Sequence, residues 1–148
     1  ETLEQNGILQ YEISNFTRPG YESRHNLKYW HCEEYLGLGP SAHSFLNGRR
    51  FYYPRDLRGF LAGKPPVPDG TGGDFTEYAM LALRLCEGLS EENVQTRFGH
   101  GIPQEMRSRA VPLAAHGLLV SDESGIRLTR TGFLVSNAVL AELLDCLE

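Results

Sequence analysis

The side chains best suited to holding a ligand are gathered in the stretch 11–45, where aromatic, His, Asn and Gly residues are unusually dense. Within six positions, His25, Asn26, Tyr29 and Trp30 supply an imidazole, an amide and two large aromatic rings. A flat, electron-rich cofactor needs such apolar faces together with a few fixed polar groups. The segment therefore predicts a cofactor-binding site.

His25 is the candidate metal ligand of this group, because neutral imidazole is the commonest axial donor to heme iron. An isolated His beside aromatic residues is also often a hydrogen-bonded packing residue. The neighbouring amide of Asn26 and the flat faces of Tyr29 and Trp30 favour the ligand hypothesis, and the packing alternative stays open.

A second group of candidate residues is glycine-rich. The apolar residues of 35–38 predict a buried strand that runs into a loop, and Gly37, Gly39, Ser41 and His43 lie along this stretch, whose backbone can approach a ligand closely. The Gly-x-Gly pattern lacks a third glycine and a following helix, so it does not indicate a dinucleotide site. Backbone freedom at a strand end explains the glycines equally well, and His43 is as consistent with packing as with ligand contact.

A hydrolase is a remote further alternative. Ser41, Ser44 and His43 lie near Glu33 and Glu34, which together are the residue types of a catalytic triad. Their order and spacing match no nucleophile elbow.

Composition and charge limit the classes of protein to consider. The 148 residues are 41% hydrophobic and 22% charged, which suits one compact domain or two small ones, and the net charge of −5 disfavours nucleic acid and anionic membranes. No apolar run approaches the roughly 20 residues that span a bilayer, so we expect no integral membrane segment. The three widely spaced cysteines predict neither a disulfide framework nor a zinc site, and reduced thiols favour a cytoplasmic location.

The first half of the chain predicts short helices and strands of an α/β fold. Residues 63–73, rich in Gly and Pro, predict a linker between a domain at 1–62 and a second domain at 74–148. The elements expected before the linker are a helix end at 1–7, strands at 8–14, 35–38 and 50–54, a loop or short helix at 25–32, and a helical turn at 57–61.

The second half predicts helices around a β-hairpin. Pro112 is expected to kink or restart the third of these helices. Three helices, a hairpin and a further helix describe a winged-helix-like domain. The expected elements are helices at 74–87, 90–99 and 103–116, a hairpin at 118–128, and a helix at 130–147 capped by Thr129.

Winged helices often read nucleic acid, but the charges here oppose that function. From Phe75 onward there are six Arg, no Lys and ten Asp or Glu, a balance of −4. We therefore expect no nucleic-acid partner. The alternative to nucleic-acid binding is a packing or interaction module that covers a neighbouring domain.

The motifs YEISNF, RPG, HNLKYW and EYLGLGPSAHS, with the later GLL and RLTRTGFLVSN, resemble the radical SAM family of oxygen-independent coproporphyrinogen III oxidase and the HemW-type heme chaperone. The resemblance covers most of the chain, and HNLKYW points to the heme-chaperone branch. It implies an α+β fold in which the last βα elements of a partial (β/α) barrel precede a small winged-helix-like domain.

The resemblance also implies cofactors, partners and a limit on activity. Relatives hold a [4Fe–4S] cluster and S-adenosylmethionine through a CxxxCxxC motif, which Cys32, Cys86 and Cys146 cannot supply. The chain is therefore expected to be a C-terminal portion that performs no radical chemistry by itself.

For such a portion the resemblance implies heme capture by His25, with Tyr29 and Trp30 near the porphyrin, and transfer to a recipient hemoprotein. The stretch from Gly37 to Ser44 is expected near the S-adenosylmethionine side of the barrel. The alternative function is that of a coproporphyrinogen oxidase, and exposed barrel edges are expected to allow a homodimer.

Overall fold

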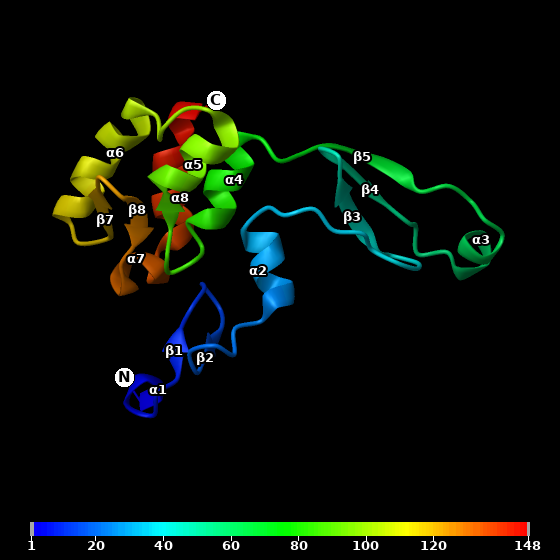
Figure 1. Cartoon of the computed structure of the whole chain (residues 1–148), viewed down its shortest axis with the longest axis horizontal. Coiled ribbons are helices and arrows are strands. Elements are labelled where there is room, and N and C mark those ends of the chain that lie inside the picture. The colour runs from blue at the N-terminus through cyan, green and yellow to red at the C-terminus, as the bar shows by residue number, and fades with distance from the viewer. Residues whose placement is uncertain (1, 148) are drawn as a thin grey trace.

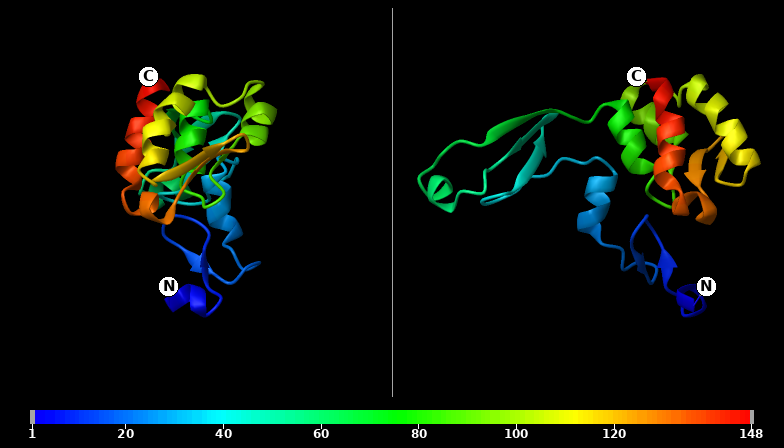
Figure 2. Two further views of the ribbon diagram at one scale, coloured as in Figure 1. Left: turned by 90° about the vertical axis from the view of Figure 1, so that its left-hand side faces the viewer. Right: turned by 180° about the vertical axis from the view of Figure 1, so that it is seen from behind.

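The computed structural model describes residues 2–147 as three parts in chain order. An N-terminal segment leads into a β arm, and the chain ends in a helical body (Figures 1 and 2). The arm and the body lie at opposite ends of an elongated molecule, and the N-terminal segment extends from the middle (Figure 1). Helices and antiparallel strands are both present, so the fold is a mixed one, as the sequence predicts.

The helical body contains nearly all of the hydrophobic core. Its sheet has the strand order β6-β8-β7 and is antiparallel throughout. Among the described residues, Cys32 and Phe45 are the buried apolar residues outside this body. The body is built from α4 (Phe75–Ala82), β6 (Leu89–Ser90), α5 (Glu91–Phe98), α6 (Gln104–Ala115), β7 (Leu119–Asp122), β8 (Gly125–Leu128), α7 (Arg130–Leu134), α8 (Ser136–Leu144) and the 3₁₀ turn η1 (Asp145–Leu147).

Side-chain caps explain where several body helices begin. The Asp74 carboxylate accepts from the Glu77 amide at the start of α4, and Ser90 and Thr129 cap α5 and α7 in the same way. Each cap satisfies an amide that has no partner within its helix. Gly99, at φ 77°, ends α5 in a left-handed turn that glycine adopts without a steric penalty.

The arm is a three-stranded antiparallel sheet with a helical turn at its far end. Strands β3 (His43–Leu46), β4 (Arg49–Tyr52) and β5 (Val67–Thr71) pair in that order, and α3 (Leu57–Leu61) lies between β4 and β5. The predicted strand and helical turn at 50–61 are confirmed. The segment 63–73, which the sequence predicted as a linker, contributes β5 to this sheet.

The N-terminal segment consists of short elements. These are α1 (Thr2–Gln5), β1 (Leu9–Gln10), β2 (Phe16–Thr17) and α2 (Arg24–Trp30). The single strand predicted over 8–14 is instead one side of the small β1–β2 hairpin. The fully buried Glu12 then makes a backbone bridge to Leu85, which attaches the hairpin to the body.

The buried strand predicted over 35–38 is wrong. Tyr35 pairs with Phe45 in one isolated bridge, whereas Leu36 and Leu38 are 59% and 84% exposed. The backbone turns here, since Gly39 has φ 102° and the Gly37 amide donates to the Ser44 hydroxyl. A backbone that turns cannot continue the hydrogen-bonded pairing of a strand, so the side chains of Leu36 and Leu38 remain exposed to solvent.

Helix boundaries differ from the predictions at three places in the body. Helix α4 ends at Ala82 rather than near Glu87, and the last helix is divided at Val135 into α7 and α8. Val135 has φ −123° and ψ 25°, outside helical geometry. Helix α6 continues through Pro112 to Ala115 without a restart, so it tolerates the one backbone hydrogen bond that this proline removes.

The burial of a leucine in the body should determine how much unfolding free energy is lost when it is replaced by alanine. Leu143 is fully buried in α8, whereas Leu134 at the end of α7 is 84% exposed. We expect Leu143→Ala to lower the free energy of unfolding by about 2–5 kcal/mol through a cavity, and Leu134→Ala by less than about 0.5 kcal/mol. Urea unfolding measures both, and equal losses would contradict this core.

Glu91 should make the stability of the body depend on pH. The Arg107 guanidinium, 2.6 Å away, and the Ile102 amide hold the pKa of Glu91 below its ordinary value. A lowered folded pKa stabilises the protein above the ordinary glutamate pKa, and that stabilisation is lost as pH falls through the folded value. The difference in unfolding free energy between the wild type and Glu91→Gln should therefore shrink on acidification; a difference that grows would contradict the ion pair.

Candidate functional site

Helix α2 carries the first group of predicted site residues. Its first turn is capped by Ser23, whose hydroxyl accepts from the Asn26 amide at 3.3 Å. At its end the His31 amide donates to Leu27, and Cys32 follows with φ 50°. A left-handed residue after the cap ends the helix, so α2 has seven residues, about two turns.

His25 and Tyr29 lie one turn apart on one face of α2. The Tyr29 hydroxyl is 3.1 Å from His25 Nε2, and the rings meet edge to face with centroids 4.9 Å apart. The His25 ring is exposed, and Nδ1 has no hydrogen-bond partner among residues 2–147. Nε2 of the imidazole is therefore hydrogen-bonded to Tyr29, whereas Nδ1 is free to bind a ligand. Metal-bound histidines are commonly hydrogen-bonded in this way at the nitrogen that does not bind the metal.

Asn26 and Trp30 form a second pair on the adjacent face of the same helix. Both are half-buried, and the Arg84 guanidinium lies 5.9 Å from the centroid of the Trp30 ring. The four predicted residues of α2 are therefore brought together as two pairs. Trp30 faces the body, whereas His25 stays accessible.

The aromatic contacts continue from α2 toward the arm. Tyr29 meets Tyr35 edge to face at 4.6 Å, and Arg50 donates to the Tyr35 hydroxyl at 3.4 Å. These side chains, with Phe45 and Glu77, line a cavity of about 180 Å³. The cavity is where helix, arm and body meet, and it is too small for a porphyrin.

The glycine-rich group is built into the arm. A Cβ at Gly37 would overlap the His43 carbonyl oxygen, so this close approach requires glycine. The Ser41 amide donates to the Tyr53 carbonyl at 2.9 Å, with Ser41 itself at φ 63°. Together with the positive φ of Gly39, these contacts fold the loop back onto the arm.

His43 also has its contacts within the arm. Its ring stacks on Tyr52 with centroids 5.1 Å apart, and Nδ1 is 3.8 Å from the Asp69 carboxylate. Among residues 2–147, no hydrogen bond, ion pair or ring contact joins His43 to His25. The two predicted groups are thus separate in this structure.

The sequence did not identify the residues that connect these parts. Arg97 donates to the carbonyl oxygens of His31 and Cys32 at 3.0 and 2.8 Å, and so holds the end of α2 on α5. Arg50 pairs with Glu77 across 27 positions. Such pairs leave no local sequence pattern, since their partners are distant in sequence. Tyr35 and Phe45, which contact Arg50, lie within the aromatic-rich stretch 11–45.

The cysteines do not form a cluster site. Burial raises the pKa of the Cys32 thiol and of Cys86, which favours the neutral thiols over metal-binding thiolates. Within residues 2–147, no group of three or more His, Cys, Asp or Glu is placed to hold a metal ion. The residues present therefore do not fit an iron–sulfur cluster.

A family match and a fold similarity together define the class of protein to which the chain belongs. Residues 75–135 match the family described as the HemN C-terminal domain. Over 96% of the chain, the fold is similar to that of coproporphyrinogen III oxidase (HemN) from Escherichia coli, a radical SAM enzyme, with a TM-score of 0.65, 18% identity and 38% of that structure covered. The chain belongs to the radical SAM family of HemN and HemW and corresponds to its C-terminal portion.

Curated relatives give a more particular similarity. The chain is 35% identical over 96% of its length to the heme chaperone HemW of Bacillus subtilis, and 36% identical over 93% to that of Mycobacterium tuberculosis strain H37Rv. Over 86% of the chain, it is 34% identical to the mouse radical S-adenosyl methionine domain-containing protein 1, mitochondrial.

The shared region is a minor part of these relatives. The chain spans 40% of the Bacillus protein, 35% of the mycobacterial one and 24% of the mouse one. Among the described residues, no helix has the length and apolar character needed to traverse a bilayer.

Removing the Arg97 side chain should release α2. Arg97→Ala deletes two hydrogen bonds from a charged donor, each contributing about 1.5–3 kcal/mol, so amide hydrogen exchange over 24–32 should accelerate. Arg109→Ala is the matched control, because Arg109 on α6 pairs with Glu142 and Asp145 rather than with α2. Unchanged protection of α2 in Arg97→Ala would contradict this anchoring role.

Proposed function

We propose that the chain is the heme-binding C-terminal part of a radical SAM heme chaperone, and that it passes heme to a recipient hemoprotein. Its relatives above 30% identity include proteins named heme chaperone. The observation that carries the proposal is the accessible His25 ring, held at one nitrogen by Tyr29 and open at the other.

His25 is the proposed axial ligand to the heme iron. A neutral imidazole donates a nitrogen lone pair to iron, and a hydrogen bond at the other nitrogen sets the orientation of the ring. Because α2 lies on the surface, the open side of the porphyrin would remain accessible to a ligand from the recipient. Heme transfer then requires exchange of one axial bond.

The other predicted residues have supporting roles in this proposal. Tyr29 orients the imidazole and packs beside the porphyrin, whereas Asn26 and Trp30 position α2 on the body and border the heme edge. Gly37, Gly39, Ser41 and His43 are proposed as a wall of a cofactor pocket completed by other parts of a longer protein. Their separation from His25 is consistent with a heme site on α2 and a distinct cofactor pocket beside the arm.

The finer architecture is part of the same proposal. Residues 1–62 correspond to the last elements of a partial (β/α) barrel, and residues 74–148 to a winged-helix-like domain. The [4Fe–4S] cluster and S-adenosylmethionine belong to the longer protein, since the residues described here do not fit a cluster. A cytoplasmic location and a homodimer through strand edges remain predictions.

A coproporphyrinogen oxidase is the second candidate function. The E. coli oxidase supports it through fold similarity, but at 18% identity that similarity concerns the fold alone. The chaperone is favoured because the proteins that carry that name are about twice as similar in sequence.

Hemin titration tests the role of His25. We expect hemin to shift its Soret band on binding the wild-type chain, and the shift to be lost in His25→Ala because the axial nitrogen is gone. His116→Ala is the control, since His116 is exposed at the C-terminal end of α6 and its Nδ1 contacts the carbonyl of Pro112 in that helix.

Far-ultraviolet circular dichroism of each variant separates loss of the ligand from loss of the fold. An unchanged Soret shift in a folded His25→Ala would remove His25 as the ligand. Loss of the shift in His43→Ala instead would move the heme site to the arm.

A further inference from the structure

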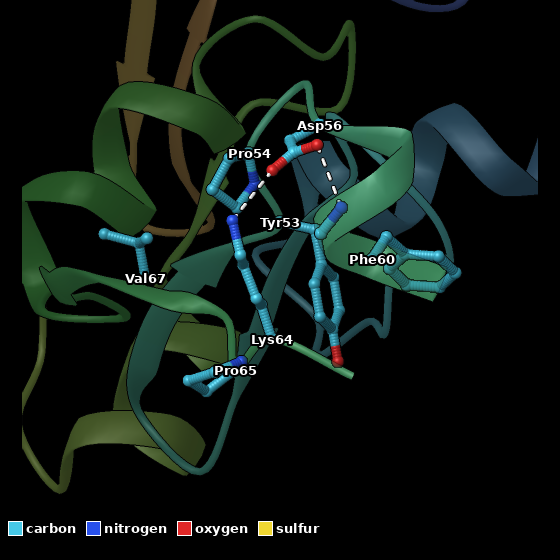
Figure 3. Close-up of a pocket in the computed structure, with 8 residues that line it drawn as sticks. Tyr53, Pro54, Asp56, Phe60, Lys64, Pro65 and Val67 are labelled. Atoms are coloured by element: carbon cyan, nitrogen blue, oxygen red, sulfur yellow. Dashed lines mark hydrogen bonds and ion pairs between the residues drawn. The ribbon is translucent and has the colours of Figure 1, made fainter. Parts of the chain in front are cut away.

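The far end of the arm contains a cavity of about 200 Å³. Figure 3 shows its lining residues, which come from the end of β4, from α3 and from the segment leading into β5. Tyr53 and Phe60 meet edge to face at 5.1 Å, and Pro54, Pro65 and Val67 supply further apolar surface. Lys64 and Asp56 are its charged members.

The size and lining of this cavity fit one large apolar side chain. Pockets for drug-sized molecules are about 300–1,000 Å³, so this cavity is too small for a porphyrin or a dinucleotide. Apolar anchor residues that insert into such pockets dominate the energy of many protein interfaces. The cavity is therefore of the kind that receives an anchor from another polypeptide.

Exposed apolar residues extend the surface beside the cavity. Leu57 and Leu61 of α3 are 61% and 75% exposed and lie one helical turn apart. Nothing in residues 2–147 covers them. Cavity and leucines together form an apolar strip at the tip of the arm, which we term the tip surface.

The segment that forms the tip surface is basic in an acidic chain. Residues 53–66 contain three of the 14 basic residues and one of the 19 acidic residues, so this segment carries +2 and the remainder −7. Arg55 and Arg58 are exposed and have no ion pair among the described residues. Their charge is available to a partner.

We infer that the tip surface binds an acidic polypeptide segment, whose apolar anchor side chain enters the cavity that Tyr53 and Phe60 help to line, while its carboxylates face Arg55 and Arg58. The positive charges of the tip surface favour an acidic partner, because charges at the rim of an interface speed the association of oppositely charged chains and disfavour like-charged ones. The inference does not depend on heme binding by α2.

The chemistry of the cavity mouth favours a polypeptide over nucleic acid. Asp56 caps α3 by accepting from the Gly59 amide at 2.9 Å, and it lies 3.2 Å from the Lys64 ammonium. These two interactions hold the pKa of Asp56 below its ordinary value, so the carboxylate is charged at neutral pH. This carboxylate is neutralised by Lys64, and the interior behind it is lined mainly by apolar side chains, which suit an apolar side chain rather than a phosphate.

Fluorescence anisotropy with a labelled peptide tests the inference. The probe is a helical glutamate-rich peptide with phenylalanines at i and i+4, and its companion carries serine at both positions. We expect saturable binding of the first peptide to the wild-type chain, weakened by salt as exposed charges are screened. The serine peptide should bind at least about tenfold more weakly.

Variants at the tip locate the binding. Arg58→Glu and Leu61→Ser change exposed side chains, and each should weaken binding at least about tenfold. Arg18→Glu is the matched charge reversal, since Arg18 is exposed in the N-terminal segment, and it should bind as the wild type does. Phe60→Ala then tests the cavity itself.

Three outcomes would overturn the inference. The first is no saturable binding of the phenylalanine peptide, or equal binding of the serine peptide. The second is equal loss in Arg18→Glu and Arg58→Glu. The third is that single-stranded RNA, or a second copy of the chain detected by sedimentation, binds in an Arg58-dependent way while the peptide does not.

Discussion

The contact of Arg50 with Glu77 joins the arm to the body. Arg50 on β4 pairs with Glu77 on α4, stacks on Phe45 at 4.6 Å and donates to Tyr35. Since the first 73 residues bury few apolar side chains, the arm depends on such polar contacts rather than on a core. Replacing either Arg50 or Glu77 alone would leave the other charge partly buried without a partner, so the contact requires both residues.

Local chemistry predicted the body well. Asp74, Ser90 and Thr129 mark real helix starts, because a cap is decided by residues within one turn. The arm was harder to predict: β5 forms within a Gly- and Pro-rich segment only because β4 offers it a partner. Likewise, Leu36 and Leu38 are apolar without being buried, since the turn at Gly39 decides their exposure.

The candidate site was predicted in part for the same reason. His25 and Tyr29 could be paired from sequence, since helical spacing places i and i+4 together. The contact of Trp30 with Arg84, and the separation of His43 from α2, depend on how α2 packs against the body and the arm. Arg97, which anchors α2 from 65 positions away, is specified only by tertiary structure.

The central claim is that His25 is the axial ligand of a heme held on α2. Electron–nuclear double resonance of the ferric heme-loaded chain, labelled with ¹⁵N-histidine, measures that bond directly. The account predicts a strongly coupled histidine nitrogen in the wild type that is absent from a folded His25→Ala. The same nitrogen coupling in both proteins, or in neither, would contradict it.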